Sequence, residues 1–596
     1  MRRSMARGLI ACTAGAGACV VSDEGLRRSV RVFGFCAGAG TAFAIADIQA
    51  SDQFERDAER ASLHQRFAPD ALELVLELRG FYLKAAQTLA VTGLLPLPYE
   101  RAFSAVLLEA DAAAATSALA RPSARVREIV AAELGCPLEE VFSNWNDAPL
   151  AAASIGQVHC ATLHSGERVA VKVMVDATAE RLFRLDLRVA RLLLGIAGGH
   201  WAGAARGILD GLAFSFECEL DYQKEAVALR RCHENLQQRA ENFQHWLRVP
   251  LPIDAAHPSA PHVRPSGGEG GRRSLCSRRV LTMEALEGGA PLATKIVQLM
   301  ERWASQRGLT LAQLRSAHKA ELEDTQRLGA LLGTAPPSKA EAALATALAH
   351  ATDAAANTAR LAFNLSLTGP HNPLGSRSGA ARPLAFKWSG QPCELLSGPK
   401  IFALLCDAHG HQVFADGYFN SDPHAGNCLV LEDGKLGLVD YGAAASLSVP
   451  QRRAFAQLIV ALADDDDEAV LEACACDDLG FASLRDDRTY VLARALMCFH
   501  RGQHLDDLQQ RAGVPPEVGA EELHGWLQSR DSLVKFEPHL FQLQRCVLAL
   551  LAIARQMGAS NVSIAHMWRP HAARFLAAHS GSGDDALPVD LPSQSQ

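Results

Sequence analysis

The sequence predicts an α+β fold, with a small strand-rich region followed by a long helical one. Between residues 141 and 175, short apolar runs flank a Ser165-Gly166 turn, which is typical of antiparallel strands. Two further apolar runs between residues 428 and 439 surround a Glu432-Asp433-Gly434 turn and predict a β-hairpin. From residue 450 onward, apolar residues recur at helical spacing and predict a helical region.

The composition is that of a globular protein with enough apolar residues for more than one domain. The 596 residues are 48% hydrophobic and 21% charged. The net charge of -8 gives no support to nucleic-acid binding, and no nucleic-acid partner is expected. The cysteines form no CxxC pairs, which favours free thiols in a reducing compartment over a disulfide framework or a zinc site.

The first 50 residues have the character of a targeting or membrane-associated segment. Residues 1–22 contain three arginines and no acidic residue, which is typical of an organellar transit peptide; the alternative is an Ala-rich start without structure. Residues 32–46 are uncharged and apolar, and three arginines precede them. They are shorter than the roughly 20 residues that a spanning helix needs. A membrane-associated or re-entrant segment and a buried helix both remain open.

Helices are predicted on both sides of the first strands. Apolar residues such as Leu72, Val75 and Leu78 recur at helical spacing within residues 52–135, and residues 178–245 return to a helical pattern.

Strand signals resume at residues 247–252 and 279–284. The Pro/Gly-rich loop at 255–277 between them is expected to be disordered or extended. Residues 300–395 are Ala-rich, contain no concentration of functional residues and are interpreted as an insertion. The polar tail from residue 581 is expected to be disordered.

Two short runs carry most of the chemical information. Asp422 precedes Asn427 by five residues, and Asp440-Tyr441-Gly442 begins thirteen residues after that Asn. Both spacings match the catalytic loop and the metal-binding loop of protein-kinase-like enzymes. In such sites one carboxylate orients or deprotonates an attacking hydroxyl. The amide oxygen and a second carboxylate hold Mg²⁺ on the nucleotide phosphates.

The first predicted strands carry the residues expected to contact a nucleotide. Lys172 follows Val169-Ala170-Val171 on a strand, where a kinase-like site places the lysine that meets phosphates and a helix-borne glutamate. Glu225 is the best candidate for that glutamate, in the helix that begins near Asp221. The alternative for such a lysine by itself is an exposed side chain on an edge strand.

The run from Pro149 to His159 lies where a kinase fold has its Gly-rich phosphate-covering loop. Here alanines replace the glycines, and alanine keeps the backbone farther from phosphates. The run contains four candidate nucleotide-binding residues: Ala151, Ala152, Ala153 and Ser154.

Together these residues resemble the UbiB family of atypical kinase-like proteins, also called aarF-domain kinases. The resemblance covers roughly residues 60–290 and 398–575. The motifs that carry it occur in the family's order: Lys84-Ala85-Ala86-Gln87, Ala151 to His159, Glu219-Leu220-Asp221 with Glu225-Ala226, Ser421 to Asn427, and Asp440-Tyr441-Gly442. Ala86, Ala425 and Tyr441 depart from the family pattern, but none of these changes removes a metal ligand or the catalytic carboxylate.

The resemblance implies an α+β, two-lobed protein-kinase-like fold with an N-terminal helical extension and a helical C-terminal lobe. The implied division of the chain is a transit and apolar segment at 1–50, the extension at 51–140, the N-lobe and hinge at 141–290, the insertion at 300–395, the C-lobe at 396–580 and the tail at 581–596.

The resemblance also implies ATP and Mg²⁺ as cofactors. It places Asp422, Lys172 and Glu225 in catalysis, Asn427 and Asp440 on the metal, and Glu284 with Lys172 and the Ala-rich run on the nucleotide. Four residues are expected to be regulatory, with Lys84 projecting into the site and pairing with the two acidic ones: Lys84, Gln87, Glu219 and Asp221. That arrangement would block an ordinary protein substrate.

The implied function is an ATPase, or a small-molecule or lipid kinase, linked to ubiquinone or other prenyl-lipid metabolism. Its expected setting is an organelle, with the mitochondrion favoured over the chloroplast and membrane association expected. The expected partners are ATP, a prenyl lipid or membrane surface, and lipid-biosynthesis proteins. Two alternatives stay open: a non-catalytic, nucleotide-gated scaffold for a lipid-synthesis complex, and a protein Ser/Thr kinase.

Overall fold

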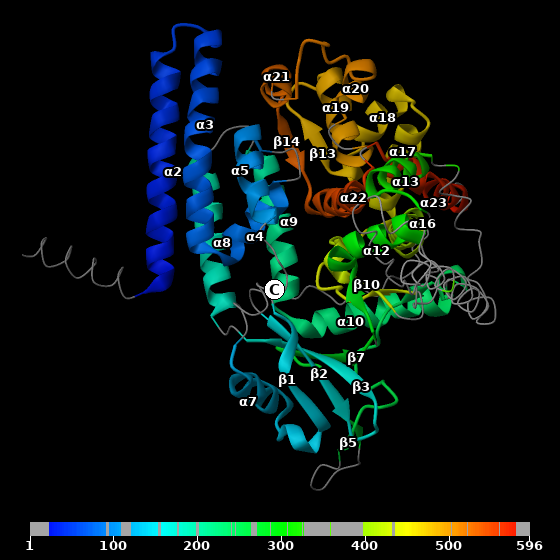
Figure 1. Ribbon diagram of the computed structural model, residues 1–596. Coiled ribbons are helices and arrows are strands. Elements are labelled where there is room, and N and C mark those ends of the chain that lie inside the picture. Colours follow the sequence, from blue (N-terminus) through cyan, green and yellow to red (C-terminus); the bar gives the residue numbers. More distant parts are fainter. Residues whose placement is uncertain are drawn as a thin grey trace, which may run out of the picture.

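The computed structural model places a helical extension beside a β-sheet lobe and a helical lobe (Figure 1). It describes the following residues: 23–90, 95–108, 121–152, 156–175, 178–197, 202–239, 241–244, 246–263, 271–286, 288–306, 308–324, 326, 358, 397–431, 435–501, 504–520, 522–559 and 561–579. The expectations for residues 1–22, for the turn at 432–434, for most of the insertion and for the tail at 581–596 lie outside the described residues.

The extension contains four helices: α2 (Glu24–Gln49), α3 (Gln53–Leu78), α4 (Gly80–Leu89) and α5 (Leu97–Leu108). Asp23 and Asp52 cap α2 and α3 by accepting hydrogen bonds from backbone N–H groups in the first turn of each helix. The two long helices lie side by side (Figure 1) and share the edge-on ring contact of Phe35 with Phe67. Arg79, with φ of 55°, separates α3 from α4.

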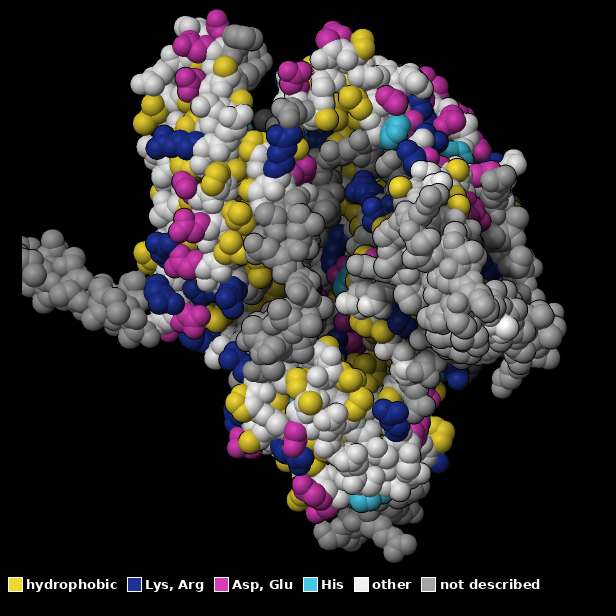
Figure 2. All heavy atoms as spheres, in the orientation of Figure 1, with side chains coloured by type: hydrophobic (Ala, Val, Ile, Leu, Met, Phe, Trp, Pro, Cys, Tyr) yellow, Lys and Arg dark blue, Asp and Glu magenta, His cyan; other side chains and the backbone are white. Residues whose placement is uncertain are grey.

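Helix α2 is longer and more exposed than the sequence suggested. It has 26 residues, long and apolar enough to cross a membrane, and only 17% of its most apolar window is buried. The interpretation of residues 32–46 as a buried helix is therefore wrong. The uncharged segment at 32–46 is short, but the helix extends beyond it at both ends: it begins at Glu24, capped by Asp23, and ends at Gln49. On the surface of α2 and α3, hydrophobic side chains lie between charged ones (Figure 2).

The β-sheet lobe is built on four antiparallel strands in the order β1-β2-β3-β7. Their bounds are β1 Phe142–Ala152, β2 Gly156–Leu163, β3 Arg168–Met174 and β7 Val280–Glu284. Val169, Val171 and Val173 of β3 face a small core that is closed by α7 (Ser123–Leu134). Helix α7 was expected in the extension. It packs on this sheet instead, because Val126, Ile129 and Val130 complete the core.

The other face of the sheet turns toward helices from the middle of the chain. These are α8 (Ala179–Ala197), α9 (Ala202–Glu219) and α10 (Tyr222–His233), followed by a π-helical turn η2 (Glu234–Arg239) and α11 (Glu241–Gln244). Asp221 caps α10 by accepting a hydrogen bond from the Gln223 N–H. Although α8 and α9 fall in the range expected for the N-lobe, α8 packs on α2 and α4, and α9 packs on the helical lobe.

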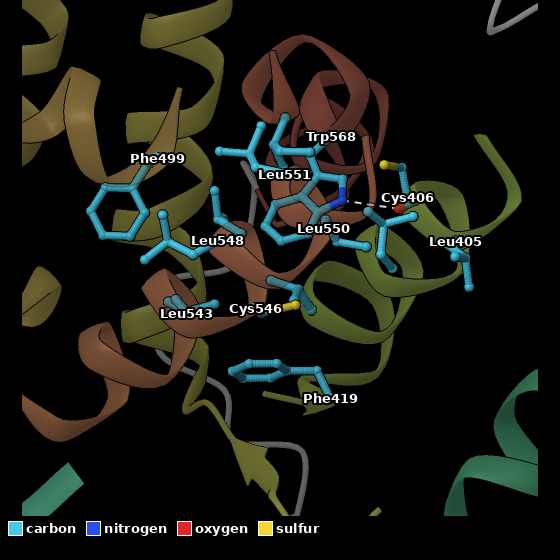
Figure 3. Close-up of a cluster of buried hydrophobic side chains, with 14 of the residues drawn as sticks. Leu405, Cys406, Phe419, Phe499, Leu543, Cys546, Leu548, Leu550, Leu551 and Trp568 are labelled. Atoms are coloured by element: carbon cyan, nitrogen blue, oxygen red, sulfur yellow. Dashed lines mark hydrogen bonds between the residues drawn. The ribbon is translucent and has the colours of Figure 1, made fainter. Parts of the chain in front are cut away.

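The helical lobe has a large core centred on long apolar helices. The bounds are α12 Leu292–Gln306, α13 Leu311–Leu322, α16 Gly398–His411, α17 Val449–Ala463, α18 Asp467–Cys474, α19 Arg488–Phe499, α20 Leu505–Gln510, α21 Leu523–Arg530, α22 Pro538–Gln556 and α23 Ile564–Ala578. Figure 3 shows Trp568 in this core, where its indole N–H donates to the Cys406 carbonyl over 2.9 Å.

The expected insertion starts too early. Residues 300–322 were assigned to it, yet Met300, Trp303, Leu314 and Leu322 are buried in the core of the helical lobe. Helices α12 and α13 therefore belong to this lobe, and their apolar faces pack into its core.

Short strands form the remaining small sheets of the described chain. They are β4 Leu247–Arg248, β5 His262–Val263, β6 Gly271–Arg272, β8 Ala290–Pro291, β9 Tyr418–Asn420, β10 Cys428–Val430, β11 Leu436–Leu438, β12 Ala444–Ser446, β13 Phe481–Ser483 and β14 Leu533–Phe536. The predicted hairpin is confirmed, because β10 and β11 pair antiparallel. The loop at 255–277, expected to be disordered or extended, contains the paired strands β5 and β6 in its described part. One expectation is corrected: the region after 450 is not wholly helical, because β13 pairs with β14.

Three glycines one turn apart let α9 approach the helical lobe closely. A Cβ on Gly203 would lie 2.4 Å from the Val534 carbonyl oxygen, and one on Gly207 would lie 2.0 Å from that of Phe536. A Cβ on Gly211 would meet the Phe541 ring at 2.6 Å. Backbone oxygens cannot yield as a flexible side chain can, so this stripe determines how near α9 lies to β14.

We therefore expect Gly207→Ala to destabilise the protein by about 1–3 kcal/mol, because the added methyl forces α9 away from β14. Chemical or thermal unfolding of the full chain measures the change. Gly195→Ala on α8 is the matched control: no described atom lies within 4 Å of its added Cβ, and a small gain in stability is expected. Equal behaviour of the two variants would contradict the close-packing argument.

Candidate active site

Strand β3, helix α10 and the loop after β11 bring three charged side chains together. Lys172 Nζ lies 2.8 and 2.9 Å from the two carboxylate oxygens of Glu225 and 3.2 Å from Asp440 Oδ2. Register with β2 and β7 places Lys172 in the middle of the sheet, and its ammonium lies 5.1 Å from the Tyr222 ring centroid. The Glu225 side chain is fully buried. The sequence-predicted residues Lys172, Glu225 and Asp440 thus form one ion cluster.

Burial and charge compete in this cluster. Burial favours the neutral form of Glu225 and raises its pKa to about 7, although Lys172 acts in the opposite direction. Burial also opposes ionisation of Asp440, but Lys172 and the Gly442 N–H outweigh it and lower the pKa of Asp440 to about 2. Burial works against the Lys172 ammonium as well, but the carboxylates of Asp440 and Glu225 raise its pKa. Lys172 and Asp440 are therefore charged near neutral pH.

The predicted catalytic carboxylate has a partner that the sequence did not reveal. Arg545 of α22 donates from Nη2 to Asp422 Oδ2 over 3.0 Å, and its Nη1 donates to Ser215 Oγ of α9. Burial opposes ionisation of Asp422, but Arg545, followed by His424 and Lys84, outweighs it and lowers the pKa of Asp422. Arg545 lies 123 residues after Asp422, in an apolar helix. The one sequence signal for its role was a charged residue in a stretch of otherwise mostly apolar, buried positions.

Asn420, at the end of β9, joins the catalytic loop to the metal-binding loop. Its Nδ2 donates to the Asp440 carbonyl over 2.7 Å, and its Oδ1 accepts from the Asp422 N–H over 2.9 Å. Asn427 lies in the same loop and donates from Nδ2 to the Asp422 carbonyl over 3.4 Å. Gly442 N–H donates to Asp440 Oδ1 over 2.9 Å. Asp422, Asn427 and Asp440 are thus held in one compact unit.

Lys84 reaches this unit from the extension. Its ammonium forms an ion pair with Glu219 at the end of α9 and lies 5.4 Å from the Phe216 ring centroid. Burial lowers the pKa of Lys84 to about 8, while Asp422 and Asp440 act in the opposite direction. The extension therefore places a cation within the electrostatic field of both site carboxylates.

Asp221 and Gln87 are the other two residues that the resemblance linked to Lys84. Asp221, expected to share Lys84, has the role of N-cap of α10. Gln87 is half-buried on α4, one turn after Lys84.

The Ala-rich run is a strand end and not wholly a loop. Ala151 and Ala152 belong to β1 and pair with Val158 and Gln157 of β2. Ala153 and Ser154 lie outside the described residues. At the start of β2, a Cβ on Gly156 would lie 2.5 Å from the Tyr222 hydroxyl, so only glycine fits beside α10. Contact of these residues with a nucleotide stays a prediction.

The structure turns Glu284 away from Lys172. On β7, Leu281 and Met283 belong to the large core, on the same face of the sheet as Lys172, which pairs with Leu281. Side chains alternate along a strand, so Glu284 projects from the opposite face. Its Oε2 accepts a hydrogen bond from the Leu251 N–H over 3.0 Å. The expectation that this side chain binds the nucleotide is corrected for that reason: the carboxylate anchors the loop before β5.

Glu284 also lies in a group with Glu167 and His257 that has the residue types of a metal site. However, His257 Nδ1 accepts a hydrogen bond from the Ser259 N–H, so in the neutral ring Nε2 carries the proton. A metal-binding histidine normally donates from its other ring nitrogen. This group is therefore arranged as a hydrogen-bonded anchor.

The donor set beside Lys172 fits Mg²⁺ bound to a nucleotide. Asp440 is ionised because its pKa is about 2, and Asn427 supplies an amide oxygen. Hard oxygen ligands of this kind are those that Mg²⁺ prefers, and it commonly takes only one or two of them from the protein. Lys172 supplies a fixed cation for phosphates. These residues can therefore hold a metal–nucleotide pair, with Asp422 close by.

Comparison with known families agrees with this geometry. The model of the ABC1 atypical kinase-like domain matches residues 115–256 and 394–474. Those two segments contain Lys172, Glu225, Asp422, Asn427 and Asp440, and the segment between them holds the expected insertion. The chain therefore contains the segments of an ABC1 atypical kinase-like domain, which supports its resemblance to the UbiB/ABC1 family. The kinase-like fold expected from the sequence is confirmed at this level.

Individual relatives of this chain are distant in sequence. The probable protein kinase UbiB of Marinobacter nauticus is 36% identical over 19% of this chain and 22% of its own. Protein ACTIVITY OF BC1 COMPLEX KINASE 7, chloroplastic, of Arabidopsis thaliana is 35% identical over 21% of this chain and 18% of its own. The match therefore spans only about a fifth of either relative. An uncharacterized Synechocystis protein is 24% identical over 67% of this chain and 70% of its own.

Among solved structures, a Mycobacterium tuberculosis protein in complex with erythromycin matches 86% of this chain and 97% of its own. The sequence identity is 19% and the TM-score is 0.38, which is too low to carry an argument.

Removal of the Lys172 ammonium tests the ion cluster. We expect Lys172→Met to destabilise the protein by about 3–5 kcal/mol at pH 8, because Glu225 and Asp440 lose their cation. Glu225 already has its pKa raised from 4.5 to about 7, so the folded state holds more protons than the unfolded state between these values. Without Lys172 this window extends to higher pH, and the loss of stability should be larger at pH 8 than at pH 5.

Unfolding by denaturant at both pH values measures this effect. Lys319→Met, which removes an exposed lysine of α13, serves as control and should change stability by less than about 0.5 kcal/mol at either pH. A Lys172→Met deficit that does not depend on pH would show that Glu225 is not held by the lysine.

Proposed function

We propose that the chain is an ATP- and Mg²⁺-dependent atypical kinase or ATPase whose acceptor is a small molecule, a lipid or water. The observation that carries the proposal is the ion cluster of Lys172, Glu225 and Asp440. Asn420 links Asp422 to it, and Lys84 reaches both site carboxylates from the extension. The match to the ABC1 domain supports the phosphotransferase class.

The nucleotide is held by opposite charge. Lys172, kept in place by Glu225, would bind the phosphates, and Asp440 with Asn427 would hold Mg²⁺. When bound, the metal neutralises charge on the phosphates. Asp422 would orient the attacking hydroxyl or water, and its ionised carboxylate can accept that hydrogen bond.

The extension supports a small acceptor over a protein. Lys84 and Glu219 form an ion pair between α4 and α9, beside the carboxylates that a protein substrate would have to reach. A folded protein would have to displace this contact. A small molecule, a lipid head group or water would not. The chain is therefore proposed to act in ubiquinone or other prenyl-lipid metabolism, in keeping with the family it resembles, and not as a protein Ser/Thr kinase.

Location at an organellar membrane fits the same proposal. Helix α2 is long and apolar enough to cross a bilayer, and its exposed face between residues 32 and 46 carries no charge. Arg27 is exposed near its start, where it can meet anionic lipid head groups, whereas Arg31 pairs with Glu77 of α3. The mitochondrion is the proposed compartment, and a relative named as chloroplastic keeps the plastid as the alternative.

A nucleotide-gated scaffold is the second candidate function. It is favoured by Arg545, which already occupies Asp422 Oδ2 and leaves that carboxylate less able to accept a proton. In this case nucleotide binding would change the shape of the site without turnover.

Two substitutions test binding and turnover separately. Asp440→Asn removes the metal carboxylate, and we expect the stabilisation of the full chain by Mg-ATP against heat to disappear. Asp422→Asn should keep that stabilisation and lose single-turnover phosphate release by at least about a hundredfold. Both are measured with and without lipid vesicles.

Asp506→Asn, an exposed carboxylate near the start of α20, is the control and should leave both measurements unchanged. Unchanged stabilisation in Asp440→Asn would overturn nucleotide binding at this site. Binding without phosphate release in the unsubstituted chain would favour the scaffold. Efficient transfer to generic peptides would instead favour a protein kinase.

A further inference from the structure

Gln412 is a fully buried amide that the proposed chemistry does not use. It begins the π-helical turn η3 (Gln412–Asp416), which continues α16 and leads through Gly417 into β9. Its Nε2 donates to the Tyr441 hydroxyl over 3.0 Å, and its Oε1 accepts from the Asn420 N–H over 3.3 Å. A buried amide with both ends engaged is costly to disturb.

Both partners of Gln412 lead directly to the site carboxylates. Asn420 binds the Asp422 N–H and the Asp440 carbonyl through its side chain. Tyr441 follows Asp440 in the chain, and its side chain is 1% exposed. The Gln412 amide is thus linked to Asp422 through Asn420, and to Asp440 through both Asn420 and Tyr441.

The same hydroxyl also reaches the helix that carries Glu225. The Tyr441 side chain lies beside Cys232 of α10, close enough for each to influence the pKa of the other, and Cys232 lies two turns after Glu225 on that helix. Helix α10 therefore contacts the metal-binding loop through Cys232, besides the link from Glu225 through Lys172 to Asp440. A phenylalanine at position 441 would fill the same space but leave the Gln412 donor without its partner.

We propose that Gln412 is a positioning residue that sets the separation of Asp422 and Asp440 by holding Asn420 and the Tyr441 hydroxyl together. It touches neither nucleotide nor metal. If Tyr441 moved away, the buried Gln412 amide and the Tyr441 hydroxyl would both lose a hydrogen-bond partner. This cost holds Asp440 and Tyr441 in the position seen in the structure. The inference rests on the proposed metal–nucleotide site for its functional readout, but the clamp itself can be tested without any ligand.

The ligand-free test uses backbone hydrogen exchange on the full chain. Gln412→Leu should speed exchange at the amides of Asn420, Asp422 and Gly442, because Asn420 loses its anchor and the two loops loosen. Trp568→Phe is the matched control. It removes another buried hydrogen bond to α16, to the Cys406 carbonyl (Figure 3), and should leave those three amides unchanged.

The functional test titrates Mn²⁺, followed by electron paramagnetic resonance, in the presence of a non-hydrolysable ATP analogue. We expect Gln412→Leu and Tyr441→Phe each to weaken Mn²⁺ binding about tenfold, and Trp568→Phe to leave it unchanged. The double variant Gln412→Leu/Tyr441→Phe should weaken it by far less than a hundredfold, because one shared interaction is lost only once.

The outcomes separate the two proposals. Normal Mn²⁺ binding and unchanged exchange in Gln412→Leu would overturn the clamp while leaving the proposed function intact. Independent, multiplying effects in the double variant would also overturn it. Absence of Mn²⁺ binding in the unsubstituted chain would overturn the proposed function, and faster exchange confined to Gln412→Leu would still support the clamp.

Discussion

The charge of Lys172 is the constraint on which the rest of the site depends. It is shared between Glu225, whose side chain is fully buried, and Asp440. A buried carboxylate without a cation is costly, so the sheet, α10 and the metal-binding loop are stable together only when the lysine reaches both. The packing supports this: β3 places Lys172 mid-sheet, and Gly156 lets α10 approach close enough for Glu225 to meet it.

Helix α9 connects this centre to the extension and to the helical lobe. Its glycine face lies against β14 and α22, its Ser215 accepts from Arg545, and its Glu219 binds Lys84. Arg545 in turn binds Asp422. Helix α9 thus links the extension to Asp422, the predicted catalytic carboxylate. The ion pair of Lys84 with Glu219 and the contact of Arg545 with Asp422 therefore both depend on the position of α9.

Two substitutions in the family motifs make sense only in three dimensions. Tyr441 differs from the usual phenylalanine by one hydroxyl, and that hydroxyl is matched by the buried donor of Gln412. Ala86 replaces a glycine, and its side chain is buried in a small cluster with Ala71, Ala90 and Phe103. The methyl is accommodated within the extension and does not face the site.

The sequence alone determined the chemistry-bearing residues whose spacing along the chain is short. Asp422 and Asn427 share one loop, Asp440-Tyr441-Gly442 follows one hairpin later, and Lys172 is marked by its strand. These are local patterns, so they could be read without knowing the fold. The ion pair of Lys84 with Glu219 was expected only through the family resemblance, and the partner expected in Asp221 turned out to cap a helix.

Only the tertiary structure decided the contacts between distant segments. Arg545 and Gln412 are unremarkable in sequence and gain their roles because folding buries their polar groups next to Asp422, Asn420 and Tyr441. The direction of Glu284 depended on the strand register, and the placement of α12 and α13 in the helical lobe depended on which apolar faces meet. Burial of a polar group has a large energetic cost, but which partner relieves it is decided by packing between distant parts of the chain.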